Sequence, residues 1–296
     1  MDMVGVREIP AKSILNKHRR RDSWFLDDYS LNPYINCQFG CVYCYIHGGR
    51  YGKRIGGIAV KINAPSLLER ELRNLYKAKK FGFIALSSST EPWQPIENRY
   101  MITRKCLEIV LRYRFPIHVL TKSDLVLRDF NILKLINENA ILPVDLSDKI
   151  NCGLFLTVSL STIDEGIARI FEPHAPPPSR RLDIIEKAVN NGICAGVAYI
   201  PVLPYISDST DTLEEMVLEA KSHGARYVFF GALTLEGKGK RAFFSIIERE
   251  FPELLNKYQR LYRTSFQPSR EYQNRLYSIA RSLCRKYNVK YSLLAT

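Results

Sequence analysis

Three cysteines stand close together near the start of the chain, and their spacing is typical of a metal-binding loop. Cys37, Cys41 and Cys44 form the pattern C-x3-C-x2-C. A structural zinc site needs four ligands, usually from two C-x2-C pairs or from added histidines, and no second pair follows. Three thiolates can instead bind three irons of a 4Fe–4S cluster, leaving the fourth iron free to chelate an amino and a carboxylate group. Two alternatives stay open: a zinc loop completed by His47, and a group of thiols that binds no metal.

The other cysteines are scattered singly, which makes seven in all. A disulfide framework would spread cysteines in pairs through loops, so this pattern favours a reducing compartment. The first 22 residues contain no apolar stretch of the length that a secretory signal needs. No 18 apolar residues follow one another anywhere, so we expect no membrane association and a cytoplasmic protein.

The segments that must position the cysteines alternate between short apolar runs and stretches with helical spacing of apolar residues. Strands this apolar, followed by amphipathic helices, are typical of a parallel sheet covered by helices. With residues 31–36 as the first strand, six strands result. We therefore predict an α/β fold, a partial (βα)6 barrel of the TIM type. The other strands are expected at 81–89, 116–123, 153–161, 193–203 and 226–235, and the helices at 64–79, 98–113, 124–137, 180–191 and 211–223.

Composition divides the chain of 296 residues into three parts. Residues 1–30 are polar, and we expect an N-terminal arm, extended or with a short helix. Residues 31–237 form the predicted partial barrel. Residues 238–296 are expected to be a helical C-terminal extension, with helices near 240–250, 252–263 and 269–287.

The C-terminal extension carries most of the excess charge. From residue 240 onward, twelve Lys and Arg stand against four Glu, which accounts for eight of the net charge of +13. Ten Phe and Tyr side chains are interleaved with these bases. Cations for phosphates and flat rings for bases suit a nucleic-acid surface. The alternative is a helical cap whose aromatic side chains belong to the core, and we favour it for most of the rings. A solvent-exposed surface without a charged partner usually carries both signs of charge, so the excess of positive charge still favours a polyanion.

The cysteine triplet followed by Tyr45, at the end of the first strand of a βα barrel, resembles the radical S-adenosylmethionine (radical SAM) superfamily. More narrowly, residues 5–235 are similar to the spore photoproduct lyase-related branch, whose members are often called DNA repair photolyases. The further motifs that carry this similarity are Asn32-Pro33-Tyr34, Ser87-Ser88-Ser89-Thr90-Glu91-Pro92-Trp93-Gln94-Pro95-Ile96-Glu97, Leu120-Thr121-Lys122-Ser123, Glu172-Pro173 and Arg180-Arg181-Leu182.

The resemblance implies a 4Fe–4S cluster that reductively cleaves S-adenosylmethionine (SAM) to methionine and a 5′-deoxyadenosyl radical, which abstracts hydrogen from a substrate. A protein that reduces the cluster, such as ferredoxin or flavodoxin, is implied as a partner.

The resemblance also assigns roles to residues at the strand ends, where sites of βα barrels gather. Glu91, with Thr90 beside it, would accept the methionine ammonium of SAM; the alternative is that this segment caps a helix. Lys122 would pair with the methionine carboxylate, unless it is an ordinary surface lysine.

Further residues would contact the nucleoside part of SAM. Ser159 and Ser161 lie on one face of the fourth expected strand, where the family contacts the ribose, and we prefer Ser159. The backbone of Tyr43 would lie near the adenine. Glu172 and Arg181 look like family positions that either pair with each other or contact the substrate.

One departure from the family concerns the hydrogen donor. The spore lyase returns hydrogen to its product radical from a cysteine, and our alignment has Ser88 at that position. Cys152 and Cys194 precede or begin their strands, so both should lie at the bottom of the barrel. Lyase activity is therefore in doubt, and Tyr45 or Tyr199 are our candidate donors.

The substrate is left between three interpretations. The first is a radical SAM enzyme acting on nucleic acid, either a DNA photolesion or an RNA base, with DNA or RNA as partner. The second keeps the chemistry but moves it to a peptide or a small metabolite. The third is a non-catalytic nucleic-acid-binding protein that the cysteine site stabilises.

Overall fold

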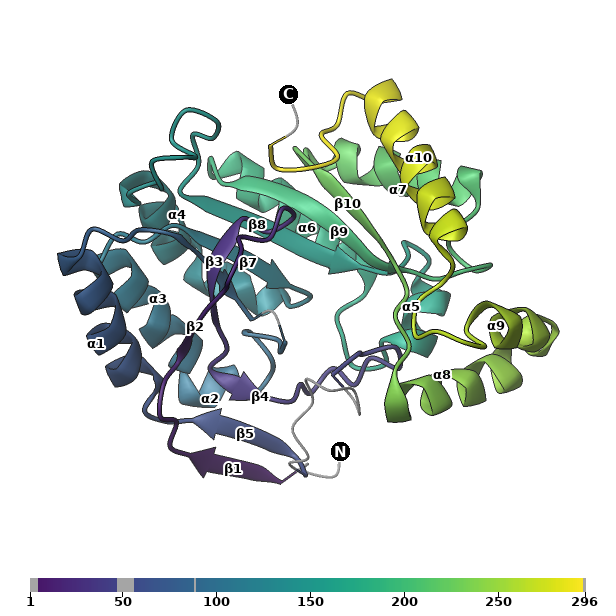
Figure 1. Ribbon diagram of the computed structural model, residues 1–296, viewed down its shortest axis with the longest axis horizontal. Helices are drawn as coiled ribbons and strands as arrows, with labels where there is room; N and C mark the ends of the chain where they lie inside the picture. Colours follow the sequence, from purple (N-terminus) through teal and green to yellow (C-terminus); the bar gives the residue numbers. More distant parts are fainter. Residues whose placement is uncertain (1–4, 47–55, 88, 295–296) are drawn as a thin grey trace.

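The computed structural model describes residues 5–46, 56–87 and 89–294, and its centre is a seven-stranded sheet (Figure 1). The strands lie in the order β10-β9-β8-β7-β6-β3-β2. All neighbours from β3 to β10 are parallel, and β2 pairs antiparallel with β3 at the edge. The bounds are β2 Leu15–Lys17, β3 Asp27–Leu31, β6 Phe83–Leu86, β7 Ile117–Thr121, β8 Leu154–Leu160, β9 Cys194–Val202 and β10 Val228–Ala232.

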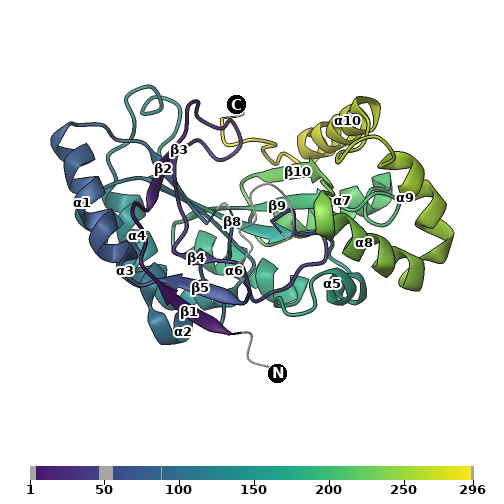
Figure 2. The same cartoon turned by 60° about the horizontal axis from the view of Figure 1, so that its bottom comes forward.

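Six parallel strands confirm the predicted partial barrel. Each residue of β8 is buried, as expected for a parallel strand covered on both faces. The helices between the strands form the outer layer, visible around the sheet in Figures 1 and 2. They are α1 Ala64–Lys77, α2 Glu97–Tyr100, α3 Ile102–Arg112, α4 Phe130–Asn139, α5 Glu165–Phe171, α6 Pro178–Asn190 and α7 Thr210–Ser222, with a 3-10 helix η1 at Asp124–Asp129.

The first barrel strand lies elsewhere than expected. It is β3, Asp27–Leu31, and not residues 31–36. The two acidic residues that begin β3 hid it from the apolar pattern; Asp27 is buried and pairs with His18, while Asp28 binds Arg21. The expected boundary after residue 30 therefore falls inside a barrel strand.

The N-terminal segment is also not an arm. Within it, β1 (Val6–Ile9) pairs parallel with β5 (Ile58–Lys61), and β5 pairs antiparallel with β4 (Tyr34–Ile35) in a separate three-stranded sheet. Arg21, the last residue of the basic run at positions 17–21, binds Asp28 and Asp145. This cation therefore stabilises the fold.

The C-terminal extension is helical as predicted, with α8 Gly237–Glu250, η2 Pro252–Leu254, α9 Leu255–Leu261 and α10 Arg270–Lys286. Four of its ten Phe and Tyr rings are buried, and one of these four is Tyr272. Phe243, Tyr258 and Tyr262 are buried in a cluster that also contains Phe39 and Tyr43 of the cysteine segment. The extension thus packs directly against the segment that carries the cysteines. Among the described residues, no helix is long and apolar enough to cross a membrane.

Candidate active site

A pocket of about 390 Å³ opens where the parallel strands end, and residues 37–46, here called the cysteine loop, form one of its walls. We call it the strand-end pocket. Below it, a buried apolar cluster that includes Phe83, Phe155 and Phe229 fills the barrel. The pocket is lined by Trp24, Phe25, Cys37, Phe39, Cys41, Tyr43, Cys44, Tyr45, Ile46, Ala85, Leu86, Ser87, Ser89, Thr90, Glu91, His118, Leu120, Thr121, Lys122, Ser159, Ala198, Ile200, Pro201, Ala232, Leu233 and Thr234.

One end of the cysteine loop is fixed to the segment after β6. Gln38 accepts a hydrogen bond from the backbone N–H of Ile96 at 2.7 Å, and its own backbone N–H donates to Gln94 Oε1 at 3.0 Å. Gln94 is fully buried. Asn36 and Gly40 have left-handed backbones, with φ of 65° and 62°, which bend the chain before and within the loop.

The other end of the loop is fixed to the segment after β8 by a buried network. The hydroxyl of Tyr43 donates to Glu172 Oε1, and Ser161 Oγ donates to the same oxygen at 3.0 Å. Glu172 also pairs with Arg181, and both side chains are 1% exposed. Arg181 Nη1 donates to the carbonyl of Ser159 at 3.1 Å, so one ion pair connects the loop with the end of β8.

The charges in this network stabilise each other. Burial alone would raise the pKa of Glu172, but attraction to Arg181 and Lys122 and the hydrogen bond from Tyr43 outweigh burial, so this pKa lies below its usual value. Glu172 is therefore an anion at neutral pH, and it lies beside the cysteine loop.

The three cysteines are the residues that would hold an iron–sulfur cluster in this pocket. All three line the strand-end pocket. In residues 5–46, 56–87 and 89–294, no three His, Cys, Asp or Glu side chains converge as the ligands of one ion would. A 4Fe–4S cluster takes each thiolate on a different iron, so its ligands need only surround a common volume. Burial raises the pKa of Cys41 to about 12, so metal binding must displace the thiol proton. His47, the alternative zinc ligand, lies outside the described residues.

Glu91 is in the pocket wall, not at a helix start. The next helix, α2, begins six residues later, so the alternative of a helix cap is wrong. Glu91 Oε1 accepts from Thr121 Oγ1 at 2.5 Å and from the N–H of Trp93 at 3.1 Å, and Oε2 accepts from the N–H of Lys122 at 2.9 Å. A carboxylate has about four acceptor positions, so one is left for a cation. Burial raises the pKa of Glu91.

Lys122, directly after β7, reaches Ser159 of the neighbouring strand β8 within the same pocket. Lys122 Nζ donates to Ser159 Oγ at 2.7 Å and lies 5.9 Å from the centre of the Tyr43 ring. Ser159 is buried, while Lys122 is half-buried. Lys122 is therefore not an exposed surface lysine, and a cation held against the pocket wall can bind an anionic group of a ligand.

The remaining residues singled out in the sequence divide into two groups. Thr90 and Tyr45 line the strand-end pocket, and Tyr45 is 43% exposed. Ser161 does not line it, because β8 ends at Leu160 and the hydroxyl turns to Glu172. Tyr199 lies outside it too: its hydroxyl donates to the Met216 carbonyl of α7 at 2.7 Å. Side chains alternate along β9, so Ala198 and Ile200 face the pocket and Tyr199 faces the helices.

Several pocket residues were not anticipated. His118 bridges the Phe25 carbonyl, 2.9 Å from Nδ1, and Thr157 Oγ1, 2.6 Å from Nε2. Burial lowers its pKa to about 4, so the ring is neutral. In the sequence, only the alternation of side chains along β7 could have indicated that His118 faces the barrel interior, on the same side as Leu120. Trp24 and Phe25 come from the β2–β3 connection, which the sequence analysis assigned to an arm.

The fold and the pocket together define a partial βα barrel with a three-cysteine loop at its strand ends, the architecture of radical SAM enzymes. A solved structure of spore photoproduct lyase complexed with dinucleoside spore photoproduct superposes with a TM-score of 0.69 at 14% identity, covering 98% of this chain and 82% of that one. Streptococcus suis SuiB bound to precursor peptide SuiA matches with a TM-score of 0.55 at 13% identity, over 91% of this chain and 48% of that one. The resemblance noted in the sequence is confirmed at the level of the fold.

Sequence comparison adds further relatives, and no protein-family model matches the chain. An uncharacterized protein of Mycobacterium tuberculosis is 29% identical over 273 residues, which is 88% of this chain and 75% of the relative. A radical SAM Nalpha-GlyT isomerase of Pseudomonas phage M6 is 27% identical over 176 residues, 59% of this chain and 33% of the relative.

The buried ion pair gives a testable prediction. Glu172→Gln leaves Arg181 buried without an anion, so we expect the free energy of unfolding at pH 7 to fall by about 3–5 kcal/mol. Because the pKa of Glu172 is lowered by folding, its contribution is complete above the unfolded value of about 4.3 and is lost as the pH falls through the folded value. Urea unfolding of both proteins should therefore show a difference that shrinks below about pH 4.

The control is Glu250→Gln, which removes the partner of Arg249 in an exposed ion pair and should cost less than about 1 kcal/mol. An equal loss in the two variants at pH 7 would contradict the account.

Proposed function

We propose that this protein is a radical SAM enzyme that acts on nucleic acid. The observation that carries the proposal is the meeting of three cysteines in C-x3-C-x2-C spacing with Glu91, Lys122 and Ser159 around one pocket. The fold shared with spore photoproduct lyase supports the same class. When bound, the cluster supplies the electron that cleaves SAM to methionine and a 5′-deoxyadenosyl radical, and a protein of the ferredoxin or flavodoxin kind supplies that electron in turn.

The residues of the chain bind and orient the two cofactors. Cys37, Cys41 and Cys44 are the cluster ligands. Glu91 keeps an acceptor position for the methionine ammonium, and Lys122 presents its ammonium to the methionine carboxylate.

Residues of β8 and β9 would hold the nucleoside end of SAM in this proposal. Ser159 contacts the ribose, with Ser161 supporting the end of β8 through Glu172. Ala198 and Pro201 give an apolar surface beside the adenine, which also lies near the backbone of Tyr43. Thr90 stays beside Glu91, 3.3 Å from Ser87 Oγ.

A hydrogen donor to the product radical must reach the pocket. Tyr45 lines it and is partly exposed, so we propose Tyr45 for this role, and Tyr199 is dropped because its hydroxyl binds α7. Ser88, aligned with the family's donor cysteine, lies outside the described residues. Cys152 and Cys194 belong to the cluster of side chains that fills the barrel and do not line the pocket.

Nucleic acid is the proposed substrate because the C-terminal extension carries the surplus of positive charge. The spore photoproduct lyase structure with a dinucleoside lesion supports this choice. SuiB shares the fold and was solved with a precursor peptide bound, so peptides are the comparison in the substrate assay.

The central test is reductive SAM cleavage. Protein reconstituted anaerobically with iron and sulfide, reduced with dithionite and given SAM should release 5′-deoxyadenosine, measured by chromatography. Cys41→Ala should release none, because one cluster ligand is lost. Cys284→Ala, a buried cysteine that does not line the pocket, is the control and should retain release.

Two results would overturn the proposal: wild-type protein that binds only zinc, and a cluster that never cleaves SAM. Either would leave a non-catalytic, metal-stabilised nucleic-acid-binding protein. Addition of DNA, RNA or peptide to an active preparation then ranks the substrates by increased release.

Lys122 has a separate expected effect. Lys122→Gln should weaken SAM binding by about 10- to 100-fold, the loss of one charge-assisted hydrogen bond, while iron and sulfide content stay unchanged. Equilibrium dialysis with labelled SAM measures the affinity. Lys134→Gln on the exposed surface of α4 is the matched control, and equal affinity in both variants would remove Lys122 from the SAM site.

A further inference from the structure

Helix α10 exposes basic side chains that have no anionic partner in the described part of the chain. The helix contains five Arg or Lys and one Glu. Lys286 pairs with Glu214 of α7, but no ion pair involves Arg281 or Arg285 in residues 5–46, 56–87 and 89–294. Both guanidinium groups are therefore available to an anion from outside.

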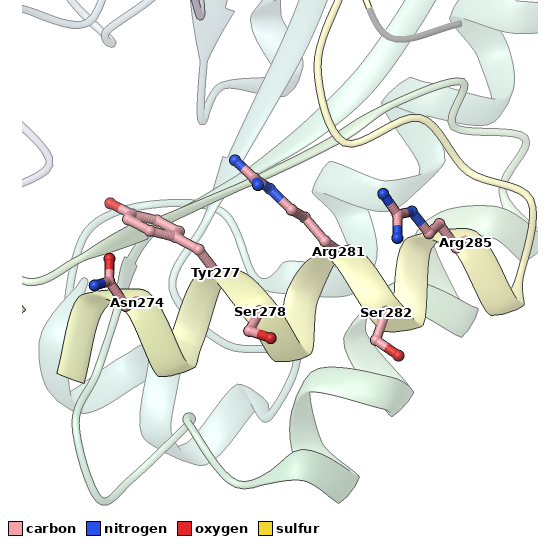
Figure 3. Close-up of a pocket in the computed structure, with 6 residues that line it drawn as sticks. All are labelled: Asn274, Tyr277, Ser278, Arg281, Ser282 and Arg285. Atoms are coloured by element: carbon pink, nitrogen blue, oxygen red, sulfur yellow. The ribbon is translucent and has the colours of Figure 1, made fainter. Parts of the chain in front are cut away.

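These arginines belong to a shallow groove of about 550 Å³, here called the α10 groove. Figure 3 shows Tyr277, Arg281 and Arg285 leaving the same side of the helix. The adjoining side carries Asn274, Ser278 and Ser282. Among the described residues no carboxylate lines the groove, and its arginine, hydroxyl and amide groups all donate hydrogen bonds.

The spacing of the donors suits a chain of repeated anions. Arg281 and Arg285 are four residues apart, which separates them by about 6 Å along the helix axis. Arg281 lies over the ring of Tyr291 at 5.3 Å, which restricts the direction of its side chain. Two cations in line, flanked by neutral donors, fit consecutive phosphates of a nucleic-acid backbone.

An aromatic contact joins the α10 groove to the strand-end pocket. Tyr277 lines the groove, and its ring packs edge-on against the ring of Trp24, with 6.5 Å between the ring centres. Trp24 lines the pocket and stacks on the ring of Phe229, with 6.3 Å between the ring centres. Arg19 and Arg20 are exposed on the same connection that carries Trp24. A nucleic-acid strand bound in the α10 groove would thus pass next to the strand-end pocket.

We propose that the α10 groove binds the phosphate backbone of a nucleic acid, and that Trp24 stacks against a base at the entrance of the strand-end pocket. The inference rests on the proposed nucleic-acid substrate and assigns the surface that recognises it. Phosphate contacts fix the strand, and the aromatic platform accepts any base.

The test measures binding of a fluorescein-labelled oligonucleotide by anisotropy, with single-stranded and duplex DNA and RNA as separate arms. The double variant Arg281→Gln/Arg285→Gln should bind about tenfold more weakly. The slope of log affinity against log salt should fall by about 1.4 for a single strand or about 1.8 for a duplex. Gln favours helices, so α10 should stay folded.

The matched control is Arg70→Gln/Lys77→Gln on exposed positions of α1, which Figure 1 shows at the opposite end of the molecule from α10. An equal change in both double variants would mean a diffuse charge effect and would overturn the assignment.

Trp24 gives an independent signal. The chain has two tryptophans, and Trp93 is fully buried, whereas Trp24 is partly exposed. A bound oligonucleotide should quench the emission of wild-type protein and not that of Trp24→Phe. Unquenched emission at saturation would contradict the stacking role.

Neither assay requires SAM or a reductant, so this inference and the proposed function can fail separately. Loss of 5′-deoxyadenosine release with intact groove binding would contradict only the enzyme. If 5′-deoxyadenosine is released but the Arg281→Gln/Arg285→Gln variant binds the oligonucleotide as tightly as wild type, only the assignment of the groove would be contradicted.

Discussion

The buried ion pair between Glu172 and Arg181 is the interaction on which the site most depends. Burial of two charges is costly unless each finds partners, and here the partners are the cysteine loop and the end of β8. Glu172 accepts a hydrogen bond from the hydroxyl of Tyr43 in the cysteine loop, and Arg181 donates one to the carbonyl of Ser159 at the end of β8. The ion pair therefore sets where the cysteine loop lies relative to the pocket wall.

The other contacts of the cysteine loop complete this arrangement. Gln38 and Gln94 bind it to the segment after β6, and the rings of α8 and α9 pack on Phe39 and Tyr43. The loop is thus held by hydrogen bonds at one end, by an ion-pair network at the other and by apolar packing between. Cysteines on so constrained a loop are held in place, which the proposed cluster and cofactor would both need.

The sequence was informative wherever a periodic or a local signal existed. The apolar runs located five of the six parallel strands, and the cysteine spacing located the loop. The first strand was missed because Asp27 and Asp28 break the apolar pattern, although the fold pairs them with His18 and Arg21. Burial of a charged residue depends on partners distant in sequence, and periodicity alone does not reveal them.

Side-chain direction was the second limit. Tyr199 was a reasonable donor by residue type, yet the alternation along β9 turns its hydroxyl to α7. Ser161 shares a face with Ser159 only as long as the strand continues, and β8 ends at Leu160. His118 and Trp24 belong to no motif, and only the curvature of the partial barrel and the β2–β3 connection bring them to the pocket.

The most direct test of the account is electron paramagnetic resonance of the reconstituted, reduced protein before and after addition of SAM. An open iron that chelates SAM predicts a reduced-cluster signal whose g values change when SAM is added. A cluster signal that SAM leaves unchanged, or a protein that takes up zinc and no iron, would contradict the central claim.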